Sequence, residues 1–203
     1  MTKGLVTIFG GSGFIGRYAA RELVKKGWRV RVACRRVNLA GEVRLAGAPG
    51  WVDIAQANIR DRASIERALE DADAVVNLVG VLTEKGKQTF ESTQAEGAAL
   101  LAEVAAEKGI TRFVQISAIG ADAESKSHYA RTKAEAEEAV RKAVPTATIL
   151  RPSVVFGPED EFFNKFAQMA RVAPVMPAIG GGKTKMQPVY AGDVAEAIAV
   201  SVD

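Results

Sequence analysis

The feature that most constrains this chain is a glycine-rich turn that directly follows a short apolar segment. Residues 5–9 read LVTIF, which is typical of a buried parallel strand, and residues 10–16 read GGSGFIG. Helical periodicity then extends to about Lys26. A strand, a turn and a helix in this order place free N–H groups and the positive end of a helix dipole beside the strand's carboxyl end, which attracts phosphate.

The glycines follow the spacing Gly10-x-x-Gly13-x-x-Gly16, which differs slightly from the commonest dinucleotide-binding spacing. Glycines in such a turn allow a tight bend, a close approach to a pyrophosphate and packing of the helix on the strand. We therefore expect a dinucleotide to bind there. The alternative is a tight turn without a ligand.

Strand and helix patterns alternate along the chain, which predicts an α/β fold, a Rossmann-type doubly wound parallel sheet with helices on both faces. The expected strands are 5–9, 29–34, 51–55, 73–78, 110–116 and 146–150, and the expected helices are 14–26, 63–70, 88–108 and 129–144. We expect residues 1–155 to form the nucleotide-binding domain. Residues 156–203 would begin a smaller substrate region that continues beyond this chain.

The C-terminal part carries three further expectations. A helix at 161–171 would pack Phe162, Phe163 and Phe166 in the core. Asp193 would cap a last helix that ends near Val200. The loop that begins at Pro174 and Pro177 and ends in Gly180, Gly181 and Gly182 would form a lid or a docking surface.

Composition excludes several classes of protein. The net charge of the 203 residues is only +3 with scattered basic residues, so no nucleic-acid-binding stripe is expected. No apolar run reaches the ~20 residues that span a bilayer. The single cysteine, Cys34, and the early first strand favour a cytoplasmic protein without a leader peptide. We expect no metal site, and His128, the only histidine, should face away from its neighbour Tyr129.

Two arginines indicate which dinucleotide the turn would take. In a nucleotide-binding unit of this kind, the end of the second strand meets the adenosine ribose, where an acidic residue would bind the 2′-hydroxyl of NAD(H). Here Cys34 is followed by Arg35 and Arg36, and guanidinium groups pair with phosphate. The sequence therefore favours NADP(H), with NAD(H) as the second candidate. The alternative is that both arginines are solvated loop charges.

A serine, a tyrosine and a lysine occur where proton-transfer chemistry could use them. Ser117 lies just past the strand expected at 110–116, and Tyr129 and Lys133 lie four residues apart on the helix expected at 129–144. Residues with that spacing share one helix face. The lysine would lower the pKa of the phenol, and Tyr129 would exchange a proton with a substrate hydroxyl or carbonyl. The alternative is an ordinary surface pair.

These motifs resemble the short-chain dehydrogenase/reductase superfamily, in its extended or atypical branch. The match covers almost the whole chain and is carried by GGSGFIG at 10–16, VVNLVG at 75–80, Ser117, YARTK at 129–133, RPSVVFGPED at 151–160 and QPVYAGDVAEA at 187–197. RPSVVFGPEDEFFNKF and KTKMQPVYAGDV are more specifically similar to a branch of the NAD-dependent epimerase/dehydratase family, the NADPH-holding accessory subunits of respiratory complex I and their bacterial relatives.

The resemblance implies a set of site residues. The nicotinamide end would hold Ser117, Tyr129 and Lys133 as the catalytic group, with Pro152 close by. The cofactor contacts would be Gly10, Gly11, Ser12, Gly13, Phe14, Ile15, Gly16, Arg35, Arg36, Asn58, Ile59, Leu78, Val79, Gly80, Tyr129, Lys133 and Pro152. Asn58 departs from the aspartate that extended members often have there, and the short segment between Ser117 and Tyr129 argues against a sugar-nucleotide substrate.

Two functions of different classes follow. The first is a nucleotide-holding accessory subunit or assembly factor of a respiratory NADH:quinone oxidoreductase, at the cytoplasmic face of the inner membrane and without a transmembrane segment. The second is an active NAD(P)-dependent oxidoreductase, epimerase or dehydratase that uses Ser117, Tyr129 and Lys133. A sensor of the NADP(H) ratio is a third reading, but a sensor needs no proton relay.

Overall fold

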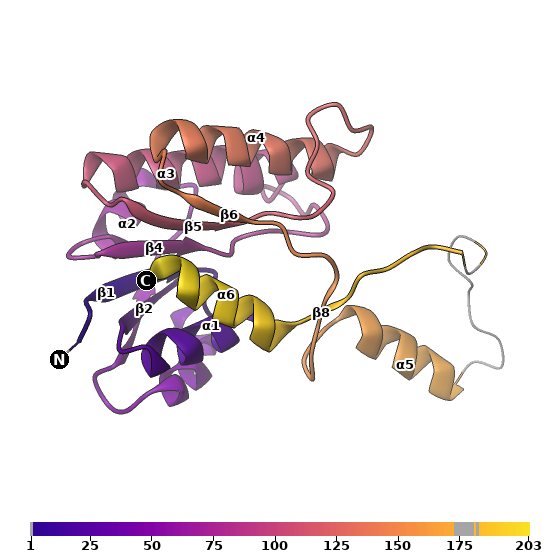
Figure 1. Cartoon of the computed structure of the whole chain (residues 1–203), viewed down its shortest axis with the longest axis horizontal. Coiled ribbons are helices and arrows are strands. Elements are labelled where there is room, and N and C mark those ends of the chain that lie inside the picture. Colours follow the sequence, from indigo (N-terminus) through magenta and orange to yellow (C-terminus); the bar gives the residue numbers. More distant parts are fainter. Residues whose placement is uncertain (1, 173–180, 182) are drawn as a thin grey trace.

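A six-stranded parallel sheet forms the centre of the protein (Figure 1). The computed structural model describes residues 2–172, 181 and 183–203. The strand order is β3-β2-β1-β4-β5-β6, with every neighbouring pair parallel. The strands are β1 (Leu5–Phe9), β2 (Arg29–Cys34), β3 (Val52–Gln56), β4 (Ala74–Asn77), β5 (Arg112–Ile116) and β6 (Thr148–Leu150). The predicted Rossmann-type sheet is confirmed.

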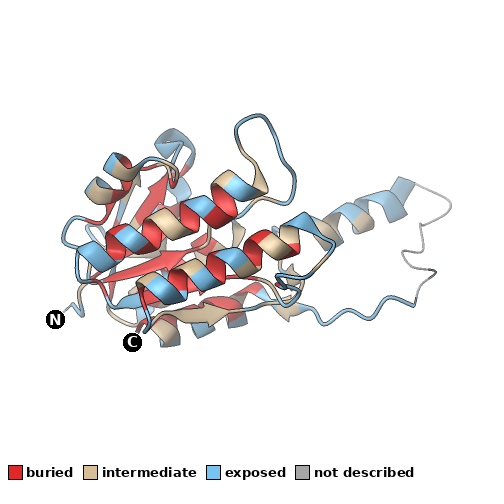
Figure 2. Ribbon diagram, turned by 90° about the horizontal axis from the view of Figure 1, so that it is seen from above, coloured by how far each residue is buried: buried red, intermediate tan, exposed pale blue. Residues whose placement is uncertain are grey.

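Helices cover both faces of this sheet (Figures 1 and 2). One face carries α1 (Phe14–Lys25) and α6 (Ala191–Val202), and the other carries α2 (Arg62–Ala68), α3 (Glu96–Glu107) and α4 (His128–Ala143). Because both faces are buried, the strands are apolar on both sides: Val6 and Ile8 of β1 pack in the core under α1 and α6, whereas Phe9 packs in the opposite core. This explains why the run LVTIF is continuous rather than alternating.

Shorter elements connect these layers. After β2, two short helical turns, Val37–Leu39 and Gly41–Ala46, lead toward β3. A π-helical turn at Glu91–Ala95 precedes α3, so the helix expected at 88–108 is two elements. Beyond β6, β7 (Val155–Phe156) pairs with β8 (Val189–Tyr190), and α5 (Phe162–Val172) lies between them in sequence.

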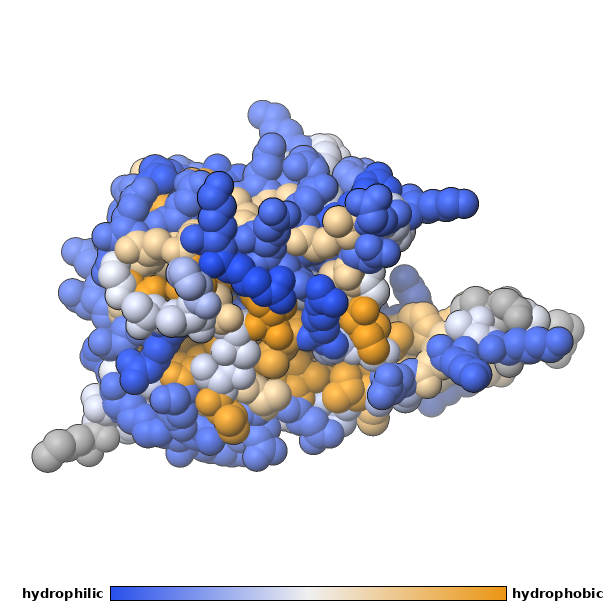
Figure 3. All heavy atoms as spheres, turned by 45° about the horizontal axis from the view of Figure 1, so that its top comes forward, coloured by the Kyte–Doolittle hydropathy of each residue, from blue (hydrophilic) through white to orange (hydrophobic). Residues whose placement is uncertain are grey.

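The expectation that the aromatic residues of α5 pack in the core is wrong. This helix projects from the body of the protein and contains no buried residue (Figure 1). Its phenylalanines contact one another: the Phe162 ring centroid lies 5.1 Å from that of Phe163 and 5.2 Å from that of Phe166. Figure 3 accordingly shows apolar surface on the projecting part of the molecule. The amphipathic spacing predicts the helix correctly, but it does not indicate whether the apolar face is covered.

The expected cap of the last helix is also wrong. Helix α6 begins at Ala191 with Tyr190 at its N-cap position, and Asp193 lies inside the first turn without a capping hydrogen bond. The loop predicted as a lid or docking surface falls largely outside the described residues, since 173–180 and 182 are not described. The predicted domain boundary at residue 155 stays a prediction, and α6, which follows it, packs in the core against α1.

The end of α6 is fastened to the beginning of the chain. The carboxylate of Asp203 accepts hydrogen bonds from Lys3 Nζ at 2.7 Å and from Trp28 Nε1 at 2.9 Å, and Lys26 Nζ lies 3.6 Å away. These contacts lie at the end of the sheet where β1 begins, opposite the glycine turn that follows β1. Within the described ranges, no helix has the length and apolarity needed to cross a membrane.

Candidate functional site

The glycine turn between β1 and α1 is held in a shape that excludes side chains. Gly10 has φ +79°, and a Cβ there would lie 3.1 Å from the carbonyl carbon of Leu78. A Cβ on Gly16 would lie 2.5 Å from the Cα of Gly11, which backbone packing forbids. Helix α1 starts after Gly13, and no side chain caps it. The N–H groups of its first turn are therefore directed toward whatever binds at this edge.

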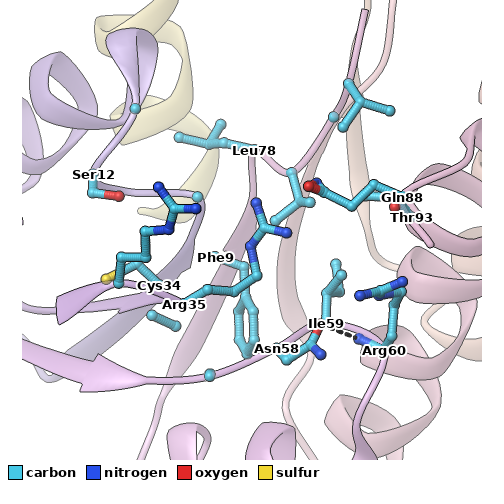
Figure 4. A pocket seen from close by; sticks show the side chains of 18 of the residues that line it. Phe9, Ser12, Cys34, Arg35, Asn58, Ile59, Arg60, Leu78, Gln88 and Thr93 are labelled. Atoms are coloured by element: carbon cyan, nitrogen blue, oxygen red, sulfur yellow. Dashed lines mark hydrogen bonds between the residues drawn. The ribbon is translucent and has the colours of Figure 1, made fainter. Parts of the chain in front are cut away.

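A cavity of about 520 Å³ opens beside this turn at the carboxyl ends of β1, β2 and β4 (Figure 4). Its size is typical of a small-molecule or cofactor site. Ten residues that the sequence predicts as cofactor contacts line it: Gly10, Ser12, Gly13, Arg35, Arg36, Asn58, Ile59, Leu78, Val79 and Gly80. Of the sequence-predicted site residues, these ten are thus the ones that the fold brings together.

Four predicted residues of the turn lie beneath or beside the cavity. Gly11 faces Val32 and Ile8, Gly16 packs on Gly11, and Ile15 joins the core under α1 and α6. The ring of Phe14 packs edge-on against Tyr18, with centroids 5.8 Å apart. These residues shape the turn, and whether Gly11, Phe14, Ile15 or Gly16 touches a ligand through its backbone stays a prediction.

The cavity is electropositive. Among its described lining residues are three arginines, Arg35, Arg36 and Arg60, and no carboxylate. Arg35 and Arg36 follow β2 directly and are exposed, whereas Cys34 is buried, which raises the pKa of its thiol despite a hydrogen bond with Ser12. Such a wall would attract a polyanion rather than a cation.

Sequence reasoning missed the other nine lining residues, among which Arg60, Gln88 and Thr93 carry polar side chains. The backbone N–H of Arg60 donates to Asn58 Oδ1 at 3.2 Å, and its guanidinium donates to the Lys87 carbonyl, which places the side chain at the mouth of the cavity (Figure 4). Arg60 directly follows the Asn58-Ile59 pair, so proximity in sequence could have suggested it. Nothing in the sequence indicates that Gln88 or Thr93 reaches this cavity.

Lys133 is buried next to Gly80 and does not itself line the cavity. Its side chain reaches the carbonyl of Ile116, to which Nζ donates at 3.2 Å, and Nζ lies 6.0 Å from the ring centroid of Tyr129. Burial lowers the pKa of Lys133 from its ordinary 10.5 to about 8, although the charge of Glu137 partly offsets this effect. At neutral pH the lysine is therefore mainly charged, at a cost in solvation.

The expected lowering of the Tyr129 pKa by Lys133 is not found. Burial of the Tyr129 phenol raises its pKa, because burial disfavours the charged phenolate. The ammonium lies over the ring rather than beside the hydroxyl, so its charge acts weakly on the oxygen. Phe90 packs edge-on against Tyr129 and also against His128, with ring centroids 5.7 Å apart in each pair.

Ser117 lies just after β5, as predicted, and its hydroxyl is buried without a hydrogen-bond partner. The carboxylate of Glu137 is close enough to be influenced by this hydroxyl, but no hydrogen bond of normal geometry joins the two groups. Glu137 is instead engaged by Arg151, whose Nε and Nη2 each donate to it at 2.7 Å. Burial raises the pKa of Glu137, but the hydrogen bonds from Arg151, the nearby Ser117 hydroxyl and the charges of Arg151 and Arg141 together outweigh burial, so the pKa is lowered overall.

The predicted catalytic residues do not line the cavity beside the glycine turn. Gly80 connects the two regions, because a Cβ there would lie 3.5 Å from Lys133 Nζ. Pro152 lines a second cavity of about 430 Å³ between the end of β6 and α6. The described residues contain no cluster of side chains suited to a metal ion. That Ser117, Tyr129, Lys133 and Pro152 meet a nicotinamide ring stays a prediction.

Comparison with known proteins gives a consistent picture. A model of the NAD dependent epimerase/dehydratase family matches residues 6–203. The chain is 40% identical over 200 residues to the mitochondrial NADH dehydrogenase (ubiquinone) 1 alpha subcomplex subunit 9 of Arabidopsis thaliana, which covers 98% of this chain and 50% of that protein. It is 32% identical over 181 residues to the ceramide reductase of Caulobacter vibrioides, which covers 87% of this chain and 54% of that protein.

A solved structure from Bacillus halodurans, assigned to the NAD-dependent epimerases/dehydratases, superposes with a TM-score of 0.77 at 24% identity and covers 98% of this chain and 88% of that one. At this identity the likeness concerns the fold. The chain spans about half the length of the curated relatives it matches.

Proposed function

Since the chain belongs to the NAD dependent epimerase/dehydratase family, we propose that the cavity beside the glycine turn holds NADP(H). The observation that carries this proposal is the wall of three arginines without a carboxylate, next to a turn where Gly10 and Gly16 exclude side chains. The pyrophosphate would rest on the N–H groups at the start of α1, as the family's dependence on a nicotinamide dinucleotide requires.

The preference for NADP(H) over NAD(H) rests on the end of β2. Arg35 and Arg36 lie where the 2′ position of the adenosine ribose would come, and Cys34 stands where an acidic residue would repel a 2′-phosphate. Guanidinium groups form strong, geometrically matched hydrogen bonds to phosphate oxygens. NAD(H) would leave these cations without a partner, so it would bind more weakly.

The proposal is tested by measuring NADPH and NADH affinities of an Arg35→Ala variant by titration calorimetry. Loss of a charge-assisted contact of ~1.5–3 kcal/mol predicts a ~10- to 100-fold weaker affinity for NADPH. Affinity for NADH should change less than about twofold. Arg29→Ala is the matched control, because Arg29 lies at the other end of β2, away from the cavity. This variant should leave both affinities unchanged. Equal losses for both nucleotides with Arg35→Ala would overturn the assignment.

We further propose that the protein is a nucleotide-holding accessory subunit or assembly factor of a respiratory NADH:quinone oxidoreductase. This is supported by the 40% identity to a relative named as a subunit of such an enzyme. In that role bound NADPH would stabilise the fold rather than turn over, because a ligand stabilises the state that it binds. The protein would act at the cytoplasmic face of the inner membrane.

A pull-down of the tagged full-length protein from its own cells, with mass spectrometry of the captured proteins, tests this role. Recovery of respiratory oxidoreductase subunits, reduced for the Arg35→Ala variant and unchanged for Arg29→Ala, is the expected result. Their absence from the captured material, with nucleotide still bound to the protein, would reject the accessory role and leave the binding proposal intact.

A second candidate is an active oxidoreductase. It is favoured by the buried Lys133 beside Tyr129 and by the unpartnered hydroxyl of Ser117, together with the 32% identity to a ceramide reductase. Bound NADPH would supply a hydride to a substrate carbonyl carbon. Tyr129 would give its phenolic proton to the carbonyl oxygen, which Ser117 would hold by a hydrogen bond, and a hydroxyl group would result.

This candidate is tested by assaying the wild-type protein and a Tyr129→Phe variant with a panel of ketone substrates. NADPH oxidation is measured as a loss of NADPH absorbance. If the protein turns over, the variant should lose nearly all activity while NADPH affinity stays within about twofold, since proton transfer commonly contributes ~100- to 10,000-fold. A wild-type protein that binds NADPH but oxidises none of it with any substrate would favour the accessory role.

A further inference from the structure

Thr93 carries a polar group that the protein itself does not use. Its side chain is only 5% exposed and lines the cavity beside the glycine turn. Its hydroxyl oxygen has no hydrogen-bond partner, whereas the backbone N–H of the same residue donates to the Thr89 carbonyl at 3.2 Å. Leaving a buried hydroxyl unsatisfied costs ~1–3 kcal/mol, so such groups are rare unless something outside the chain completes them.

The position of Thr93 in the cavity indicates which part of a ligand it meets. Thr93 lies one helical turn before Gly97, whose Cα approaches so closely that a Cβ there would lie 3.0 Å from Ile59 Cγ2. This helical segment therefore packs against Ile59, and Thr93 lines the same cavity as the Asn58-Ile59 pair, whereas Ser117 does not line it. Figure 4 shows Thr93 beside Gln88, across the cavity from Ser12 and Cys34.

The local backbone is consistent with a functional position. Thr93 is the central residue of the π-helical turn Glu91–Ala95, and π-helical turns are rare and frequently occur at functional sites. The neighbouring Gln94 is engaged within the protein: its Oε1 accepts from the Val81 N–H at 3.4 Å, and its Nε2 donates to Thr132 Oγ1 at 3.4 Å. Thr93 is thus the member of this turn that lines the cavity and carries a hydroxyl without a partner in the chain.

We propose that the Thr93 hydroxyl forms a hydrogen bond with the adenosine half of the bound dinucleotide, and that it contributes to affinity through that half alone. This inference rests on the proposed function of the cavity. The contact would add a binding residue from the π-helical turn before α3 to the contacts expected from the ends of β1, β2 and β4.

The test compares Thr93→Val, which keeps the shape but removes the hydroxyl, with Thr93→Ser, which keeps the hydroxyl. Two fragments are titrated calorimetrically: adenosine 2′,5′-bisphosphate for the adenosine half and reduced nicotinamide mononucleotide for the other half. Thr93→Val should bind the adenosine fragment ~5- to 20-fold more weakly, as expected for one lost hydrogen bond. Thr93→Ser should bind it within about threefold of wild type, and the nicotinamide fragment should be unaffected by either change.

A stability measurement distinguishes a binding role from a structural one. Since the hydroxyl has no partner in the chain, Thr93→Val should leave the melting temperature of the nucleotide-free protein unchanged or raise it. Thr7→Val is the matched control, because the Thr7 hydroxyl donates to the Ala68 carbonyl at 3.0 Å; that variant should melt earlier and bind the adenosine fragment normally.

Unchanged affinity of Thr93→Val for the adenosine fragment would overturn the inference, and so would an equal loss with Thr93→Ser. If the valine variant does not fold, a crystal structure of the wild-type protein with adenosine 2′,5′-bisphosphate tests the contact instead. A Thr93 Oγ1 more than about 3.5 Å from every polar atom of the ligand would contradict the proposed hydrogen bond. Failure of the wild-type protein to bind either fragment or NADPH would instead refute the proposed function of the cavity.

Discussion

Replacement of Lys133 by methionine should make the nucleotide-free protein more stable. The lysine is 5% exposed, and burial lowers its pKa from 10.5 to about 8, although the charge of Glu137 opposes this effect. Each unit between these two pKa values corresponds to ~1.4 kcal/mol. Keeping Lys133 charged at pH 7 therefore costs ~3 kcal/mol, of which methionine, similar in length and uncharged, would relieve a large part.

The substitution should not leave a new unsatisfied group. The Ile116 carbonyl that accepts from Lys133 Nζ also accepts from Gln115 Nε2 at 3.0 Å, so it keeps a partner. We therefore expect Lys133→Met to raise the free energy of unfolding by ~2–3 kcal/mol at pH 7. Lys142→Met is the control on the same helix, because Lys142 is exposed and its replacement should change stability little.

The pH dependence gives the decisive measurement. The folded-state pKa lies below the unfolded one, so the penalty is fully present below about pH 8 and disappears as the pH rises toward 10.5. Urea denaturation at pH 7, 8, 9 and 10 should show the stability difference between Lys133→Met and wild type shrinking by up to ~1.4 kcal/mol per pH unit. A methionine variant that is less stable at pH 7, or a difference independent of pH, would refute the reasoning.

Two other substitutions follow from the packing. Gly16→Ala should lower the free energy of unfolding by ~3 kcal/mol or more, because the new Cβ would overlap the Gly11 backbone. Gly13→Ala is the control: its Cβ would lie 3.3 Å from the nearest atom, so this variant should lose far less stability. Similar melting temperatures for the two variants would contradict the turn geometry. Glu137→Gln should cost ~2 kcal/mol at pH 7, since Glu137 is buried but its partner Arg151 is half exposed. Because hydrogen bonding holds the pKa of Glu137 below its ordinary 4.5, wild-type stability should fall as the pH drops below about 4.5, and this part of the acid sensitivity should be missing in the variant; parallel pH profiles would contradict it.

The central sheet was predictable because it needs only local signals. A strand covered on both faces is apolar throughout, and glycine ends such as Gly27, at φ +90° after α1, mark where each helix stops. The strand-turn-helix order around residues 10–16 also fixed the place of the cavity. The predicted element ends differ from the observed ones by a few residues, as expected where helix ends are set by capping and packing.

The features that escaped prediction depend on contacts distant in sequence. The spacing of Phe162, Phe163 and Phe166 defines an apolar helix face, but a spacing cannot tell what that face packs against. The proximity of Lys133 and Tyr129 was predictable from their spacing, whereas the raised pKa of the phenol follows from burial that only the fold reveals. Thr93 escaped for the same reason, since a missing hydrogen-bond partner has no signature in sequence.

The contact of Asp203 with Lys3 and Trp28 has a practical consequence for engineering. It holds Lys3 and Asp203, which are 200 positions apart in the sequence, together at the end of the sheet that faces away from the glycine turn. A short peptide could therefore join them, and new termini could be opened in the exposed segment after Asp122. In a circularly rearranged form of these 203 residues, the new connection would lie far from the cavity beside the glycine turn, so the shape of that cavity should be preserved.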